Sequence, residues 1–315
     1  MILDNKLSKG ETIVLDGATG SEIARLGGAM DAAAWCGVAN KTHPEVVRLV
    51  HEEYIRAGAD VVTANTFATC RHVLAGAGLA DETVSITARA VELAREAVNE
   101  VAPDRPVAVA GSMSNNRAWI PGTVSPDPRF LPTPAEEAAN YREMAETLAE
   151  AGVDLILMEM MSDIDRASLV TAAAVETGLP VWIGVSCSIL ADGSVGAWDM
   201  HTEEPAHRLS PDHTKPRTKS LDPLIEAMAA FEPQVMGIMH STVDAMDAGL
   251  EVLSEHWRGP VMAYPETLAG HAVEPAAFAS DCRDWVESGV QIIGGCCGTT
   301  IEHIRSMVSE LPSRD

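Results

Sequence analysis

This chain has little positive charge and few aromatic side chains. Its 315 residues include 22 lysines and arginines against 46 aspartates and glutamates, a formal net charge of −24 at pH 7. So acidic a chain repels phosphate backbones and anionic lipid, and nucleic acids and membrane surfaces are therefore not expected as partners. Aromatic residues make up only 4% of the sequence, so any tryptophan in an expected loop becomes a candidate for ligand contact.

Long apolar runs, an export signal and a disulfide framework are also missing. No stretch approaches the roughly 18 apolar residues that span a bilayer. Residues 1–6 lack the basic, apolar and small-residue order of a signal peptide. Six cysteines in a chain of this length indicate reduced thiols rather than a disulfide scaffold. These absences predict a cytoplasmic enzyme or binding protein that acts on small molecules.

Short β-branched runs alternate with longer helical stretches along the chain. Apolar strands that alternate with helices indicate a parallel sheet covered on both faces. Eight such units favour a (β/α)8 barrel, and no Gly-x-Gly-x-x-Gly follows the first strand to suggest a dinucleotide-binding sheet. The expected strands are residues 12–15, 60–63, 107–110, 154–158, 181–185, 235–239, 260–263 and 291–293. The expected helices are residues 44–57, 81–101, 134–151, 164–177, 222–231, 242–256 and 274–288.

No shift in composition divides the chain, so we expect one domain over residues 1–315. Two connections, residues 112–133 and 188–220, are unusually long, and each follows a strand. In a barrel of this kind both lie on the C-terminal face, where long loops usually serve function. A flexible tether is the alternative for the second connection.

Polar and metal-competent residues follow the expected strands. Since the carboxyl ends of barrel strands share one mouth, these side chains are expected to converge there. The set consists of Asp16, Gly17, Asn65, Ser112, Glu159, Cys187, His240, Tyr264, Cys296 and Cys297.

Cys296 and Cys297 stand between glycines, directly after the apolar run at residues 290–293. Adjacent cysteines close a strained disulfide ring, but neighbouring thiolates can share a soft tetrahedral cation such as zinc. The sixth and eighth strands flank the seventh, so His240 can meet the cysteine pair above Tyr264 and complete a Cys2His site with one open position. The alternatives are small packed residues for the cysteines and a capping or hydrogen-bonded role for His240.

A zinc ion held mainly by thiolates lowers the pKa of a substrate thiol and keeps it deprotonated. Glu159 and the backbone amides near Asp16, Gly17 and Ser112 can then hold an ammonium and a carboxylate group, which suits an amino-acid thiol. The alternatives are a structural ion pair for Glu159 and a helix cap for Asp16.

Four motifs together resemble those of the homocysteine S-methyltransferase family. They are Asp16-Gly17-Ala18-Thr19-Gly20-Ser21-Glu22, Asn65-Thr66-Phe67, Glu159, and Gly294-Gly295-Cys296-Cys297-Gly298-Thr299-Thr300. The resemblance runs from about residue 15 to residue 304 and implies a (β/α)8 barrel in which a zinc-bound homocysteine thiolate attacks an activated methyl group. The family includes betaine-dependent and S-methylmethionine-dependent enzymes and the homocysteine module of methionine synthase.

The chain departs from the family pattern at one ligand. The family normally carries Gly-x-Asn-Cys after the sixth strand, and that cysteine binds zinc; here residues 237–240 read Gly-Ile-Met-His. His240 in the place of that cysteine makes the site less negative by one charge. A working Cys2His site, another metal preference and a lost methyltransferase activity are all compatible with this exchange, and the first is favoured.

A small onium compound is the expected methyl donor, because a methyltetrahydrofolate donor normally requires further modules. Onium cations are held over aromatic faces, and Trp35, Trp119 and Trp198 fall in loops on the C-terminal side, whereas Trp182 lies in a strand and is expected in the core. A sulfonium such as S-methylmethionine is favoured and betaine is second, with methionine as the product. The alternatives are another acceptor or donor, with His240 as a base, and a non-catalytic binding protein.

Overall fold

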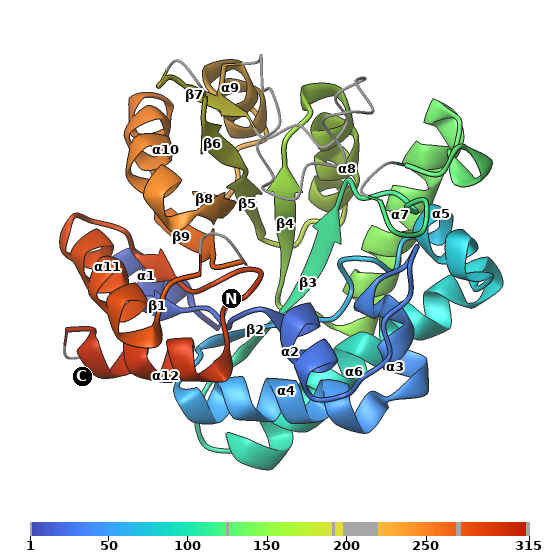
Figure 1. The fold of residues 1–315 in the computed structure, drawn as a ribbon, viewed down its shortest axis with the longest axis horizontal. Helices are drawn as coiled ribbons and strands as arrows, with labels where there is room; N and C mark the ends of the chain where they lie inside the picture. Colours follow the sequence, from blue (N-terminus) through green and yellow to red (C-terminus); the bar gives the residue numbers. More distant parts are fainter. Residues whose placement is uncertain (1, 124–125, 191–192, 198–219, 269–271, 313–315) are drawn as a thin grey trace.

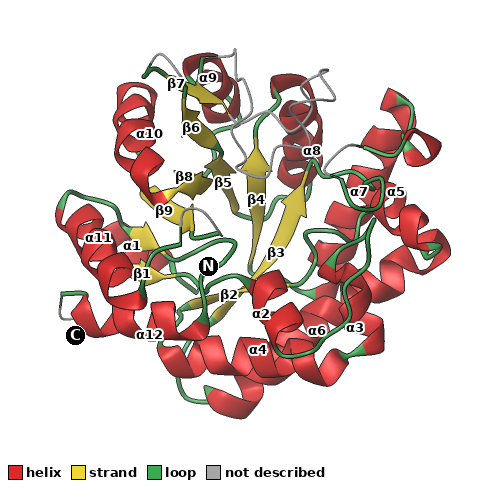
Figure 2. Cartoon of the chain, viewed as in Figure 1, coloured by secondary structure: helices red, strands yellow, loops and turns green. Residues whose placement is uncertain are grey.

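Eight parallel strands form a closed barrel at the centre of the molecule (Figure 1). The computed structural model describes residues 2–123, 126–190, 193–197, 220–268 and 272–312. The strands follow the order β1-β10-β9-β8-β5-β4-β3-β2, and a parallel bridge between Leu15 and Val61 brings the two ends of this series together. Helices surround the strands on the outside (Figure 2). The (β/α)8 barrel expected from the sequence is therefore confirmed.

Each barrel strand overlaps a range that the sequence predicted. The strands are β1 (Ile13–Val14), β2 (Val61–Ala64), β3 (Ala108–Ser114), β4 (Leu155–Met161), β5 (Val181–Val185), β8 (Val235–Thr242), β9 (Val261–Glu266) and β10 (Ile292–Ile293). A small antiparallel hairpin, β6 (Cys187–Ile189) with β7 (Val195–Ala197), follows β5 and was not expected. Most of the long connection at residues 188–220, Trp198 included, lies outside the described residues.

The seven helices predicted from periodicity are present with ends that differ by two residues at most. They are α4 (Pro44–Ala57), α6 (Thr83–Val101), α7 (Pro134–Ala151), α8 (Ile164–Glu176), α9 (Asp222–Ala229), α10 (Val243–His256) and α11 (Pro275–Glu287). Other helices were not expected from the sequence: α1 (Asp4–Lys9), α2 (Thr19–Arg25), α3 (Ala39–Thr42), α5 (Arg71–Leu74) and α12 (Ile301–Glu310). Short 3-10 turns are η1 (Cys36–Val38), η2 (Ala75–Ala77), η3 (Ala80–Glu82) and η4 (Pro128–Phe130). In the part of the chain that is described, no helix is long and apolar enough to cross a membrane.

Successive residues of a strand point to opposite faces, so the barrel has an inner and an outer layer of buried side chains. The inner layer contains Leu155, Leu157 and Trp182, all fully buried within the barrel. The outer layer contains Ile156 and Ile183, which pack between the strands and the helices. Trp182 therefore belongs to the core, as the sequence indicated. The residues of the mouth lie beyond this inner layer, at the C-terminal ends of the strands.

His51 on α4 is fully buried, and neither ring nitrogen has a hydrogen-bond partner among the described residues. Burial lowers its pKa to about 4. The unfolded chain therefore takes up a proton first, so the free energy of unfolding is unaffected by His51 protonation above about pH 6.5 and falls as the pH drops toward 4. At pH 5 the loss is about 2 kcal/mol.

Replacing His51 by leucine is expected to raise the free energy of unfolding at pH 7 by about 1–3 kcal/mol, because it removes two buried unpaired nitrogens. It should also weaken the fall in stability between pH 7 and pH 5. Denaturant unfolding at both pH values measures the two effects. The partly exposed His43 supplies a control, since His43→Gln is expected to change stability by less than about 0.5 kcal/mol. An unchanged pH dependence in His51→Leu would contradict this account.

Candidate active site

The cysteine pair lies in a glycine turn between β10 and α12, tied to the neighbouring strand end. The Cys296 amide donates to the carbonyl of Pro265 at 2.7 Å, and the Cys297 carbonyl accepts from the Thr267 amide at 2.8 Å. Gly294 allows the turn to approach the end of β1, since a Cβ there would lie 2.7 Å from that of Leu15. These contacts fix both thiols at the mouth of the barrel.

His240 reaches the thiols because β8 contains a bulge. The register between β8 and β9 shifts between Met239 and Thr242, and His240 has a left-handed φ of 49°. Such a backbone is strained for a residue other than glycine, and bulges that re-aim a side chain are common beside active sites. The Nδ1 atom of His240 lies 3.5 Å from Cys296 Sγ, and the two sulfurs are 3.9 Å apart.

The three donor atoms fit a tetrahedral zinc ion. With metal–sulfur bonds of about 2.3 Å and a metal–nitrogen bond of about 2.05 Å, the edges of a tetrahedron are about 3.8 Å between sulfurs and about 3.6 Å between sulfur and nitrogen. The distances in this structure are 3.9 and 3.5 Å, and one donor atom from each of His240, Cys296 and Cys297 lies within 4.8 Å of the others. This arrangement can hold one soft cation without rearranging the backbone.

The same three residues shift one another's pKa values. The Cys296 thiol beside it, together with His240, lowers the pKa of Cys297 to about 5, whereas the pKa of Cys296 is raised well above its ordinary value. Burial alone lowers the pKa of His240, but the carboxylate of Glu266 and the Cys297 thiolate outweigh it and raise that pKa to about 9. Cys297 therefore loses its proton more readily than Cys296.

Asp16 is fully buried at the end of β1 and is held from two sides. Its carboxylate accepts from the Thr63 amide at 2.6 Å, from the Thr63 hydroxyl at 2.9 Å and from the Tyr264 hydroxyl at 3.2 Å. Burial raises the pKa of Asp16 to about 7. Asp16 does not cap α2, whose N-cap residue is Ala18. Gly17 follows without a side chain, and a Cβ there would lie 2.7 Å from the Tyr54 hydroxyl.

Glu159 lies in β4, opposite Ser114 of β3, at a second bulge. Met160, the next residue, also has a left-handed φ, of 60°. Burial raises the pKa of Glu159 to about 7, and the nearby Ser112 hydroxyl offsets only part of this effect. A carboxyl poised in this way becomes fully ionised when a cationic group binds against it.

A methionine links the two bulges. The amide of Met160, in the β4 bulge, donates to Met239 Sδ at 3.4 Å. Met239 lies on β8 and reaches across β5, where a Cβ on Gly184 would overlap its sulfur. Glu159 and His240 are thus carried by strained segments that contact each other directly.

Aromatic side chains line the neighbouring part of the mouth. The ring of Trp35 meets the ring of Phe67 edge-on, with centroids 5.8 Å apart, and Phe67 and Trp119 both pack against Met160. The indole N–H of Trp119 is buried and has no acceptor among the described residues. The structure therefore brings Trp35 and Trp119 into one cluster through Phe67, which the sequence analysis did not select as a site residue.

The side-chain amide of Asn65 is engaged within the protein. It accepts from Cys36 Sγ at 2.9 Å and donates to the Cys36 carbonyl and to Asn40 Oδ1, each at 2.9 Å. These contacts hold the segment that begins with Trp35. They indicate that Asn65 orients the aromatic cluster.

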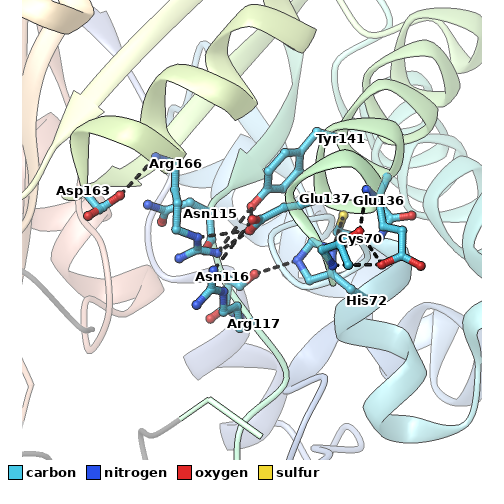
Figure 3. Close-up of polar contacts among 12 residues, drawn as sticks. Cys70, His72, Asn115, Asn116, Arg117, Glu136, Glu137, Tyr141, Asp163 and Arg166 are labelled. Atoms are coloured by element: carbon cyan, nitrogen blue, oxygen red, sulfur yellow. Dashed lines mark hydrogen bonds and ion pairs between the residues drawn. The ribbon is translucent and has the colours of Figure 1, made fainter. Parts of the chain in front are cut away.

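A buried ionic network beneath the connection after β3 was not foreseen from the sequence (Figure 3). One carboxylate oxygen of Glu137, on α7, accepts from Arg166 at 2.7 and 3.0 Å and from the Tyr141 hydroxyl at 3.0 Å. The guanidinium of Arg117 lies 3.7 Å from its other oxygen. Burial raises the pKa of Glu137, but the arginines outweigh this effect and leave it below its ordinary value.

This network anchors the backbone that leads to the aromatic cluster. Arg166 donates to the carbonyl of Asn115 at 2.7 Å, and His72 Nε2 contacts the carbonyl of Asn116 at 3.1 Å. Figure 3 shows these side chains converging on the segment from opposite sides. Trp119 follows three residues later, so the network fixes the start of the loop that carries it.

Comparisons with known proteins agree with this geometry. A family model described as "Homocysteine S-methyltransferase" matches residues 13–311. Betaine–homocysteine S-methyltransferase 1 of Danio rerio is 26% identical over 331 residues, which cover 97% of this chain and 74% of that protein. Methionine synthase of Mycobacterium leprae (strain TN) is 27% identical over 296 residues, 86% of this chain, and the match spans only 22% of that longer protein.

The fold also matches a solved structure. Homocysteine methyltransferase MmuM from Escherichia coli, in its metallated form, superimposes with a TM-score of 0.73 at 21% identity, covering 98% of this chain and 99% of that one. At this identity the likeness supports the fold, whereas the family rests on the model match across nearly the whole chain. The chain belongs to the homocysteine S-methyltransferase family and is a methyltransferase.

Proposed function

We propose that the chain transfers a methyl group from a small onium donor to the thiol of homocysteine, giving methionine, at a zinc centre held by His240, Cys296 and Cys297. The observation that carries this proposal is the set of donor distances, 3.5 and 3.9 Å, which suits a tetrahedral zinc ion. A sulfonium such as S-methylmethionine is the favoured donor and betaine the second. Residues 1–315 act in this proposal as one barrel domain, and a reducing compartment such as the cytoplasm keeps both thiols reduced.

The acceptor is held by groups around the metal centre. When bound, zinc supplies a Lewis acid that lowers the pKa of the substrate thiol and keeps it deprotonated at neutral pH. Glu159 binds the ammonium group, and the Gly17 amide with the Ser112 hydroxyl takes the carboxylate. Asp16 stays within its bonds to Thr63 and Tyr264 and keeps the turn after β1 in place.

The donor lies on the aromatic side of the mouth. The rings of Trp35, Phe67 and Trp119 exclude water, and a cation placed over the face of such a ring is favoured. A lone pair of the acceptor sulfur attacks the methyl carbon, a new carbon–sulfur bond forms, and the bond to the donor sulfur breaks with its electron pair. The positive charge of the sulfonium is thereby cancelled, and two neutral thioethers result.

Metal analysis coupled to a donor screen tests the proposal. The purified chain is expected to bind about one zinc ion, and to form methionine from homocysteine with a methyl-labelled sulfonium, more slowly with betaine. Removal of the metal should abolish transfer and readdition of zinc should restore it. A chain that binds no metal, or one that methylates homocysteine equally well without it, would rule the proposal out.

A second candidate keeps the barrel and the metal but uses another thiol acceptor or donor. His240 favours this alternative, because it replaces the thiolate that the family normally carries. His240→Cys separates the two candidates. Faster homocysteine methylation in this variant would indicate that the native substrate is a different one, whereas slower methylation supports homocysteine.

A further inference from the structure

Glu266, the last residue of β9, lies against the metal centre. Its side chain is 13% exposed, and its Oε2 atom lies 3.2 Å from Nδ1 of His240, the same nitrogen that faces Cys296. Within the described residues Oε2 accepts no hydrogen bond. A buried carboxylate oxygen is unfavourable unless a cation or a hydrogen-bond donor satisfies it. The ion-pair partner of Oε2 is the His240 ring, whose Nδ1 would bind the metal and leave the carboxylate oxygen facing that ion.

The distance between Glu266 and His240 is that of two ligands on one metal ion. Glu266 stands outside the group of donor atoms that all lie within 4.8 Å of one another, so its side chain has to turn toward the two sulfurs to complete the ligand set. Bonds of about 2.05 Å from zinc to nitrogen and to oxygen give a tetrahedral edge of about 3.4 Å between those atoms. The distance here is 3.2 Å, and the two edges that involve sulfur are 3.5 and 3.9 Å. We propose that a carboxylate oxygen of Glu266 is the fourth protein ligand of the metal centre in the substrate-free enzyme. This inference rests on the metal centre of the proposed function and adds a residue to it.

The bulge in β8 accounts for the contact. β8 and β9 regain their pairing at Thr242, which stands opposite Glu266, after the shift that starts at Met239. The bulge that turns His240 inward therefore places it beside the end of β9. In a regular ladder the two side chains would not share this register.

Charge supplies an independent argument. Zinc with two thiolates and a neutral imidazole has a formal charge of 2 − 2 = 0, and the carboxylate makes it −1. Three thiolates would also give −1. Glu266 thus restores the negative charge that His240 removes relative to a three-cysteine site. A carboxylate is a harder ligand than a thiolate, so it is the ligand that an incoming substrate thiol displaces most readily.

The test uses the full chain, stripped of metal, loaded with one equivalent of Co²⁺ or Zn²⁺ and free of substrate. Wild type is expected to show the visible spectrum of four-coordinate Co²⁺, and zinc X-ray absorption should give two sulfur and two nitrogen or oxygen ligands. In Glu266→Ala the Co²⁺ spectrum should change, and 2-mercaptoethanol should bind the metal at a concentration at least about 10-fold lower than in wild type, because no carboxylate competes. Metal affinity should fall by about 10- to 100-fold.

Two further variants serve as controls. Glu266→Gln keeps the shape of the side chain and reports the loss of charge, and the exposed Glu146→Gln, on α7, should leave spectrum and affinity unchanged. Spectra and thiol binding that are the same in wild type and Glu266→Ala would overturn the inference, even with weakened affinity, since Glu266 would then only pair with His240. These measurements need no methyl donor. Cobalt coordination as expected without methyl transfer would overturn the proposed function and leave this inference intact.

Discussion

Cys297→Ser is expected to lower bound zinc from about one ion per chain to less than about a tenth, and Cys296→Ser to do the same. A serine hydroxyl stays protonated at neutral pH and is a poor ligand for a soft cation, so each variant loses a thiolate. Since removing even an outer partner of a metal ligand weakens binding by about 10- to 100-fold, loss of the ligand itself should exceed 100-fold. Metal affinity by competition with a chelator, and methylation of homocysteine, measure the effect.

The chain offers matched controls for this prediction. Cys282 is fully buried on α11, so Cys282→Ser alters a buried thiol outside the metal centre and is expected to retain the metal. A second group of possible ligands, Asp222, Glu255 and His256, also brings donor atoms within 4.8 Å of one another, on α9 and α10. His256→Gln should therefore keep the zinc that supports activity. Full metal content in Cys297→Ser, lost on adding His256→Gln, would instead place the ion at this second group.

The positions of strands and helices followed from local chemistry. The ends of α7 agree with prediction because Thr133 caps the helix, Pro134 opens it and Gly152, with a φ of 87°, closes it. The barrel strands were visible as apolar runs because both of their faces are buried. By contrast α2 was not among the predicted helices, since Ala18 gives no side-chain cap and the helix is only seven residues long.

The candidate site was visible in its residue types but not in its details. The cysteine pair, His240 and Glu159 could be selected because each follows an expected strand, and the parallel topology gathers such residues. The contact of Glu266 with His240 depends on the bulge in β8, and no periodicity records where a strand gains an extra residue. The one sign of Glu266 in the sequence was an acidic residue directly after Tyr264 and Pro265, at the end of the seventh expected strand. The pairing of Glu137 with Arg166 joins residues 29 positions apart on different helices and left no pattern at all.

Glu159→Gln is expected to lower kcat/KM for homocysteine by about 30- to 100-fold, mainly through KM. A hydrogen bond between charged groups contributes about 1.5–3 kcal/mol, and a neutral amide cannot replace the carboxylate opposite an ammonium group. Because Glu159 is not among the metal ligands, the zinc content should stay at wild-type level. Steady-state kinetics with homocysteine and a saturating methyl donor give the two constants, and metal analysis of the same preparation separates this variant from the cysteine variants.

An acceptor without an amino group provides the decisive comparison for Glu159. The same thiol acid lacking the ammonium should be a poor substrate for wild type and an equally poor one for Glu159→Gln, because the contact that the variant loses is one this acceptor never makes. Burial raises the pKa of Glu159, and an ammonium group bound against its carboxylate would supply the charge that favours ionisation. If Glu159→Gln lowers the rate with both acceptors by the same factor, the carboxylate serves the structure of the β4 bulge and the ammonium group is bound elsewhere.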